Sequence, residues 1–292
     1  MNMKKLVSII SVVLSLGMLA SCDLLKLDNF DGPDAQVTGR FLDAKTGEKM
    51  GIESSVSSVW DWSTWSMKTT TIGTLVVIEQ GWKNNEGEPV SQNQDWMVRF
   101  DGKYTNNLVF AATYKIDTKN LPCYQPDKDE FTLNKGSNTV DFTVTPFCRI
   151  VDEKITYDAA TKKIKATFKV ELGDATKANS INNIALCANT QLFVGCNYFN
   201  LAKDDAGAKK AGAMNWTTWQ QEPAAQPGQE VTLEIDTQSA ANATLFKYTQ
   251  DRYVRIAALA AGNGYNGNNY YNFSKIYKIS ADFSKIEEAV WD

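Results

Sequence analysis

The sequence predicts an all-β protein that folds as two β-sandwich domains in tandem. From Val37 onward, short runs of β-branched and aromatic residues are separated by Gly, Asn, Asp and Thr, and no stretch keeps a helical period over three turns. A chain of 292 residues is long enough for about two domains. Its 43% hydrophobic residues include eight Trp, thirteen Phe and eleven Tyr, which supply apolar surface for a core in each domain.

The N-terminal segment has the pattern of a lipoprotein signal peptide. Lys4 and Lys5 form a cationic start, and Leu6 to Ala20 is an uncharged, mostly apolar run of fifteen residues. That run is shorter than the roughly 20 residues of a membrane span but suits a signal-peptide core. It ends in Leu19-Ala20-Ser21-Cys22, which matches the lipobox of bacterial lipoprotein precursors. We expect residues 1–21 to be removed and Cys22 to be lipidated; an ordinary signal peptide with an incidental cysteine is the alternative.

Residues 22–35 are expected to form a flexible acidic tether between the lipid and the first domain. The tether contains Asp23, Asp28, Asp31 and Asp34 and reaches about 20 Å on average. Without Lys4 and Lys5 the chain has 28 basic and 34 acidic residues, a net charge of −6. Acidic residues after a lipidated cysteine resemble the surface-export signal of gut-type anaerobic Gram-negative bacteria. We therefore expect an outer-membrane anchor with the protein facing the exterior, and a periplasm-facing lipoprotein is the alternative.

The first domain is predicted over residues 36–146. A turn at Asp101-Gly102 lies between two strand-like runs and is a hairpin signal. The strands expected in this half are Val37–Leu42, Thr74–Glu79, Asp95–Phe100, Ala111–Ile116 and Thr139–Val144.

The second domain is predicted over residues 147–292, because the strand pattern resets around Thr145-Pro146-Phe147. Alternation such as Ile164-x-Ala166-x-Phe168-x-Val170, repeated in short strands, is typical of an immunoglobulin-like sandwich. A short helix fits within Ala206–Ala213 and within Asp236–Gln250. The strands expected here are Glu153–Tyr157, Lys163–Glu171, Ile181–Cys187, Gln191–Cys196, Glu230–Ile235, Arg252–Ala258 and Ser274–Ile279.

A family resemblance is carried by the segment from Gly39 to Glu48, which reads Gly-Arg-Phe-Leu-Asp-Ala-Lys-Thr-Gly-Glu. It resembles the opening of carboxypeptidase-regulatory-like (transthyretin-like) domains, in which a strand leads into an Asp-x-x-Thr-Gly-Glu turn and Gly47 supplies a positive φ. With Asp28–Asp34 before it, the segment resembles the surface lipoproteins of the domain-of-unknown-function family 3823. The stretches Asn138–Pro146 and Arg252–Ala257 fit the same family.

The resemblance implies a carboxypeptidase-regulatory-like domain followed by an immunoglobulin- or fibronectin-like domain. It also implies a surface lipoprotein that is accessory to a starch-utilisation-like outer-membrane importer, and it supplies no catalytic residue. The chain departs from the family pattern between Glu53 and Gly73, where additional Ser, Thr and Trp residues follow the first turn.

Composition excludes several classes of chemistry. The chain has no histidine, which removes Ser-His and Cys-His nucleophile pairs and His-ligated zinc. A net charge of −4 argues against nucleic-acid binding. The clusters of Asp and Glu in the sequence are those expected of solvated charges on loops. None of these clusters has the residue spacing of a calcium-binding loop. We expect no enzyme activity, no metal and no cofactor.

Four cysteines follow the lipobox, and none forms a Cys-x-x-Cys motif. They are Cys123, Cys148, Cys187 and Cys196. Buried free thiols are the default expectation, and their disulfide status stays open at this point.

Tryptophan clusters are the main candidates for ligand binding. Trp60, Trp62 and Trp65 lie within six residues, and Trp62-Ser-Thr-Trp65 is echoed by Trp216-Thr-Thr-Trp219. Indole rings exposed on loops can stack on sugar rings, while nearby hydroxyls bond the rim of the sugar. Structural roles in a core or a latch are the alternative for each of these rings.

A second candidate is the late loop from Gly262 to Asn272, which interleaves Asn with Tyr265 and Tyr270. This composition is typical of adaptable recognition loops, and a plain Gly/Asn turn is the alternative. Together these features predict a non-enzymatic surface lipoprotein that binds glycan beside an importer. The rival prediction is a structural or docking subunit of the importer that binds no sugar, because aromatic residues are also frequent in protein interfaces.

Overall fold

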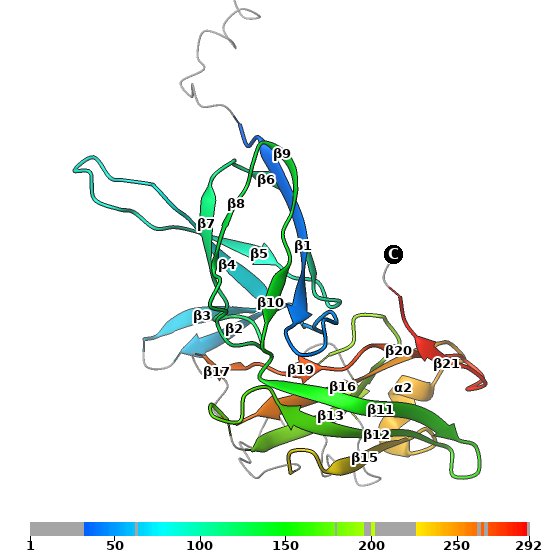
Figure 1. The fold of residues 1–292 in the computed structure, drawn as a ribbon. Coiled ribbons are helices and arrows are strands. Elements are labelled where there is room, and N and C mark those ends of the chain that lie inside the picture. Colours follow the sequence, from blue (N-terminus) through cyan, green and yellow to red (C-terminus); the bar gives the residue numbers. More distant parts are fainter. Residues whose placement is uncertain are drawn as a thin grey trace, which may run out of the picture.

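The computed structural model describes residues 32–61, 64–178, 180–195, 200–201, 226–261, 264–265 and 268–290. These residues form an all-β protein in which two groups of sheets pack end to end (Figure 1). The helical elements among them are the 3-10 turn η1 (Ala240–Asn242) and the four-residue helix α2 (Ala243–Phe246). The predicted fold class is confirmed.

The first domain contains two sheets that face each other. Strand β1 (Ala35–Asp43) pairs in parallel with β9 (Gly136–Thr139) and β10 (Phe142–Val144), and antiparallel with β6 (Lys103–Val109). In the second sheet, β4 (Thr74–Glu79) lies between β5 (Gln92–Met97) and β7 (Thr113–Asp117), and β8 (Glu130–Thr132) pairs with β7. The strands alternate apolar and polar residues, so that one face of each sheet enters the shared core.

Aromatic rings fill the centre of that core. Trp96 is 4% exposed and lies 6.0 Å, centroid to centroid, from both Tyr104 and Tyr114. Phe142 stacks on Tyr104 at 5.8 Å. The Trp96 indole N–H donates to Gln94 Oε1 at 3.0 Å, so the buried indole keeps a hydrogen-bond partner.

Two hairpins project from the first domain (Figure 1). Strands β2 (Ser55–Asp61) and β3 (Ser66–Ile72) form a separate two-stranded ribbon. The other hairpin continues β4 and β5 through residues 80–91, which are exposed except for the half-buried Val90. Backbone bonds from Asn84 N to Glu88 O and from Val90 N to Trp82 O hold its shape.

The second domain is a sandwich of a three-stranded and a six-stranded sheet. The smaller sheet has β12 (Lys163–Leu172) between β11 (Cys148–Asp158) and β15 (Glu230–Asp236). Ile164, Ala166, Phe168 and Val170 of β12 are all fully buried, as their alternation predicts. The larger sheet comprises β14 (Asn200–Leu201), β13 (Ile181–Asn189), β16 (Arg252–Ala260), β20 (Tyr277–Ile279), β21 (Ile286–Glu288) and β19 (Asn272–Phe273).

The larger sheet is covered on both faces. Val254, Ile256 and Ala258 of β16 enter the core of the sandwich. Ala257 and Leu259, on the opposite face of the same strand, pack with Phe100 of the first domain. Because β16 has no solvent face, it is apolar at nearly every position and ties the two domains together.

Arg255 is the polar exception on that covered face. Its side chain is 1% exposed, and its guanidinium donates to Ser274 O at 2.9 Å, Phe100 O at 3.0 Å and Ile52 O at 3.2 Å. The ring of Phe273 lies 4.5 Å from the guanidinium carbon. Gly51 pairs with Phe273 across the interface, and a side chain at Gly51 would collide with the Arg255 guanidinium. Arg255 therefore joins backbone carbonyls of both domains.

The structure corrects several strand predictions. Residues 191–195 form no strand, so the prediction of a strand over Gln191–Cys196 is wrong for the part that is described. In the larger sheet, Cys187 of β13 lies opposite Leu201 of β14 on one side and Arg255 of β16 on the other. The turn at Asp101-Gly102 is present, with Gly102 at φ 76°, but β5 and β6 on its two sides belong to different sheets. The strands that were not predicted include β2, β3, β6, β8, β14, β19 and β21.

Three cysteines are buried free thiols. Cys123, Cys148 and Cys187 form no disulfide, and Cys196 lies outside the described residues. Burial raises the pKa of Cys123 and of Cys148 to about 12, so neither thiol ionises at neutral pH. These thiols therefore act as small apolar groups.

We expect Arg255→Ala to destabilise the folded protein by about 3–5 kcal/mol, because it removes a buried charged hydrogen-bonding group and leaves carbonyls of both domains without their donor. Urea unfolding followed by far-UV circular dichroism measures this loss. Arg40→Ala is the control, since the Arg40 side chain is 50% exposed and pairs with Asp141 at the surface. Equal unfolding midpoints for the two variants would show that Arg255 does not hold the interface.

Candidate functional site

The tip of the β2–β3 hairpin exposes an indole ring. Asp61 pairs with Ser66 at the end of the ribbon, and Trp65 comes directly before Ser66. Trp65 has φ 51° and is 72% exposed. The neighbouring hydroxyls of Thr64 and Ser66 lie 2.9 Å apart and are exposed as well. The tip thus combines an accessible ring with hydroxyl groups, as stacking on a polyhydroxylated ligand requires.

The base of this hairpin is fixed to the first domain. Gly73, at φ 77°, joins β3 directly to β4, and its N–H donates to Asn120 O at 2.8 Å. The Ser54 hydroxyl donates to Gly73 O at 3.2 Å and contacts Val98 O. A side chain at position 73 would collide with Ser54, so glycine is required there. The hairpin therefore projects from a rigid base.

The other predicted Trp residues are only partly placed. Trp60 lies in β2 opposite Met67. Trp62, Trp216 and Trp219 lie outside the described residues. Two further tryptophans lie in different environments. Trp82 on the β4–β5 hairpin is 47% exposed, whereas Trp96 is buried in the core.

The late loop differs from the prediction. Strands β17 (Gly264–Tyr265) and β18 (Asn268–Asn269) form a small hairpin that places Tyr265 opposite Asn268. Tyr270 is 2% exposed, so the expectation that its ring lies on a recognition surface is wrong for this structure. Tyr271 and Phe273 are needed to cover the outer face of the larger sheet, and this packing draws the end of the loop inward.

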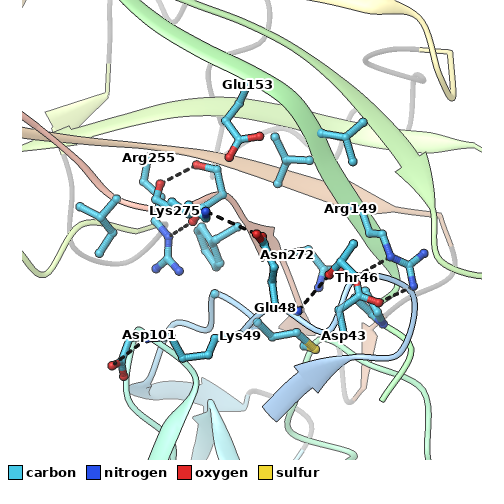
Figure 2. A pocket seen from close by; sticks show the side chains of 18 of the residues that line it. Asp43, Thr46, Glu48, Lys49, Asp101, Arg149, Glu153, Arg255, Asn272 and Lys275 are labelled. Carbon is cyan, nitrogen blue, oxygen red and sulfur yellow. Dashed lines mark hydrogen bonds and ion pairs between the residues drawn. The ribbon is translucent and has the colours of Figure 1, made fainter. Parts of the chain in front are cut away.

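A cleft of about 690 Å³ lies between the two domains (Figure 2). One wall is the turn that follows β1, from Thr46 to Gly51. The opposite wall consists of β11 residues 148–153, residues 272–276 and residues 288–290 of the second domain.

Three ion pairs fasten the end of β1 and the turn after it to the second domain. Asp43 accepts from Arg149 Nε at 2.5 Å and from Arg149 Nη2 at 2.7 Å, and both side chains are more than nine-tenths buried. Lys45 Nζ lies 2.5 Å from Glu171, and Lys275 Nζ lies 3.6 Å from Glu48. The motif that carried the family resemblance therefore builds the domain interface.

The mouth of the cleft is charged. Lys275 lies between Glu48 and Glu288, at 3.6 Å and 3.5 Å. Desolvation opposes the charged form of Lys275, but Glu288 and Glu48 more than offset it and raise its pKa. Burial and the carboxylate of Glu153, which accepts from the Tyr277 hydroxyl at 3.2 Å, raise the pKa of Tyr277.

The cleft lacks the ring surface that the hairpin provides. Phe100 and Phe273 line it, but they are only 6% and 9% exposed because Arg255 and the loop before β14 cover them. Within the described parts of the chain, no three Cys, Asp or Glu side chains gather closely enough to hold a metal ion. The β2–β3 hairpin is therefore the better candidate for binding a sugar.

Sequence reasoning did not find the cleft residues Arg149, Glu153 and Lys275. Each stands in a strand or turn of the second domain where alternation predicts an ordinary surface charge, and only the packing of the first domain against it makes them line a cleft. One feature of the sequence could have indicated the cleft. The turn motif that ends at Glu48 carries charged residues for which the first domain offers no obvious partner.

Comparison with known proteins finds a family match over the first domain. Residues 35–145 match the N-terminal domain of DUF3823, a family of proteins of unknown function. A structure of a Bacteroides uniformis protein, provisionally named as carbohydrate-binding, is 27% identical, with a TM-score of 0.63 over 85% of this chain and 100% of that one.

Two further solved structures have the same fold. A DUF3823 family protein from Parabacteroides merdae is 19% identical, covers 85% of this chain and 99% of its own, and has a TM-score of 0.56. One from Bacteroides ovatus is 18% identical with the same TM-score, covering 85% and 100%. None of these three proteins is named as an enzyme. No curated protein matches the chain.

The helices found in the described residues are all too short to cross a membrane.

We expect Asp43→Ala to destabilise the protein by about 3–5 kcal/mol, because it leaves the buried guanidinium of Arg149 without its carboxylate. Thermal and urea unfolding measure the change. Glu171→Ala removes the exposed partner of Lys45 in the same interface and is expected to change stability little. If the two substitutions had equal effects, the Asp43–Arg149 pair would not be the strong link between the domains.

Proposed function

We propose that this chain, whose residues 35–145 match the DUF3823 N-terminal domain, is a non-enzymatic, lipid-anchored surface protein that binds glycan beside an outer-membrane nutrient importer. The binding site that we assign is the tip of the β2–β3 hairpin, with the ring of Trp65 as its platform. We propose Trp60 and Trp62 as further candidates for stacking, and the Trp216–Trp219 segment as a second candidate of the same kind.

The exposed Trp65 ring is the observation that carries this proposal. The ring is 72% exposed on a hairpin whose base is fixed to the first domain, so its apolar face is available for contact with a ligand. Sugar rings offer an apolar face that can stack on an indole, and the exposed hydroxyls of Thr64 and Ser66, on either side of Trp65 in the sequence, can hydrogen-bond a polyhydroxylated ligand. The provisional name of the Bacteroides uniformis relative supports the same ligand class.

Weak binding at one hairpin is sufficient for an anchored protein. A single stacking contact gives modest affinity after the costs of association. Proteins held on the same membrane, however, meet at high effective concentration, so that several weak contacts act together on one polysaccharide. Capture beside an importer therefore requires neither a deep pocket nor catalysis.

The lipobox and the acidic tether support the location. Cys22 follows a charged start and an apolar run, and four Asp residues lie between it and β1. This arrangement would hold the hairpin outside the membrane, where polysaccharides are met.

We expect Trp65→Ala to weaken polysaccharide binding about tenfold, which corresponds to a stacking contribution of about 1.4 kcal/mol. Isothermal titration of the soluble chain from Asp23 with a panel of polysaccharides measures this effect. Trp216→Ala tests the second cluster in the same assay.

Trp82→Ala is the matched control, because Trp82 is also exposed but lies on the β4–β5 hairpin. It is expected to bind like the unaltered chain, and circular dichroism checks that all variants fold. If no polysaccharide in a broad panel binds, or if Trp82→Ala weakens binding as much as Trp65→Ala, the assignment is wrong, and a docking role in the importer becomes the better explanation.

We expect Cys22→Ser to abolish lipidation, since the sulfur is the atom to which the lipid is attached. Metabolic labelling with radioactive palmitate and fractionation of membranes measure this directly. Ser21→Ala keeps a small residue before the cysteine and is expected to leave labelling unchanged. Palmitate incorporation into the Cys22→Ser chain would contradict the proposed anchor.

A further inference from the structure

One end of the first domain is nearly free of charge. This tip consists of residues 32–36, 105–112 and 133–137, which include only Asp34 and Lys135 as charged residues. The two lie 3.1 Å apart and so neutralise each other. In a chain with 22% charged residues, such a surface can approach a low-dielectric medium without desolvating an unpaired charge.

Hydrogen bonds hold the three segments of the tip together. Ala35 pairs with both Val109 and Gly136. The Ala111 N–H donates to Asp34 Oδ1 at 2.8 Å, and the Gly136 N–H donates to Asp34 O at 2.9 Å. The tip is therefore an ordered surface and not a set of independent loops.

Two apolar side chains project from this surface. Leu108 is 75% exposed and Phe110 is 38% exposed, although Val109 between them is buried in the core. Leu108 is thus among the most exposed large apolar side chains of the described residues. Apolar side chains on a surface without unpaired charges can enter an apolar phase without a large desolvation cost.

The chain reaches the tip from its proposed anchor. β1 begins at Ala35, and only the twelve residues 23–34 separate it from Cys22. A tether of this length spans about 20 Å on average, so the lipid surface lies within reach of the tip. Figure 1 shows the start of β1, the end of β6 and the start of β9 at the end of the first domain that lies away from the second domain.

We propose that this tip docks on the lipid surface that holds the anchor, with Leu108 and Phe110 entering the headgroup region. This inference rests on the lipid anchor of the proposed function but not on glycan binding. Docking through the tip points the second domain away from the membrane, and the short tether favours the contact by keeping its effective concentration high.

Hydrogen exchange on vesicles tests the docking. The mature chain, with Cys22 replaced by a histidine tag, is bound to phosphatidylcholine–phosphatidylglycerol vesicles that contain a nickel-chelating lipid. Because the tag replaces the lipid, the result is independent of whether Cys22 is lipidated in cells. We expect amides of residues 106–112 to exchange at least about threefold more slowly on vesicles than in solution.

Leu108→Asp is expected to remove this protection, and Leu108→Ser is a milder second variant in case the charge disturbs the strand. Tyr248→Asp is the matched control, since Tyr248 is 63% exposed but belongs to the second domain. Equal exchange with and without vesicles would overturn the proposal, as would protection that survives in both Leu108 variants. Protection that increases with the density of protein on the vesicle would also overturn it, since the tip would then be contacting a second copy.

Discussion

The rest of the architecture depends on the hydrogen bonds that the Arg255 guanidinium donates to backbone carbonyls of both domains. The guanidinium is buried between the domains, and its acceptors include backbone carbonyls of Ile52 and Phe100 from one domain and of Ser274 from the other. A buried charge of this kind tolerates little displacement, because each carbonyl is fixed by its own strand or turn. The position of the first domain on the larger sheet, and with it the shape of the cleft, follows from this constraint.

Sequence patterns correctly predicted the strands that have one face in the core and the other face in water. β12 was found almost to the residue, because Ile164 to Val170 alternate between the core and water. β2 and β3 were missed, since their Ser- and Thr-rich strands pair with each other and show no alternation of that kind. The strand predicted over Gln191–Cys196 failed for the opposite reason. Leu192 and Val194 are apolar because they cover the outer face of the larger sheet as a loop, and an apolar run does not reveal which face it covers.

The part of the candidate site that was predictable from the sequence is the part formed by one short stretch of the chain. A tryptophan among small hydroxylated residues indicates a ring that a hairpin can present, and Trp65 has that position. Tyr270 was predicted on the same compositional grounds, but its ring is buried. Its neighbours Tyr271 and Phe273 pack at the domain interface, and this packing brings Tyr270 inward with them. The charged cleft could not be predicted, since Glu48 and Lys275 are 227 positions apart and meet only through the packing of whole domains. Composition thus indicates chemistry, while tertiary packing decides which residues are available for it.

The double coverage of β16 has an evolutionary consequence. A sheet whose outer face is apolar requires its neighbouring domain as a covering layer, just as a subunit of an obligate dimer requires its partner. Gene fusion or exchange that joined the second domain to an unrelated first domain would leave Ala257 and Leu259 uncovered and would remove the Ile52 and Phe100 carbonyls that accept from Arg255. The two domains are therefore expected to be inherited as one unit, and diversification is confined to the projecting hairpins, where residues can change without disturbing that shared layer.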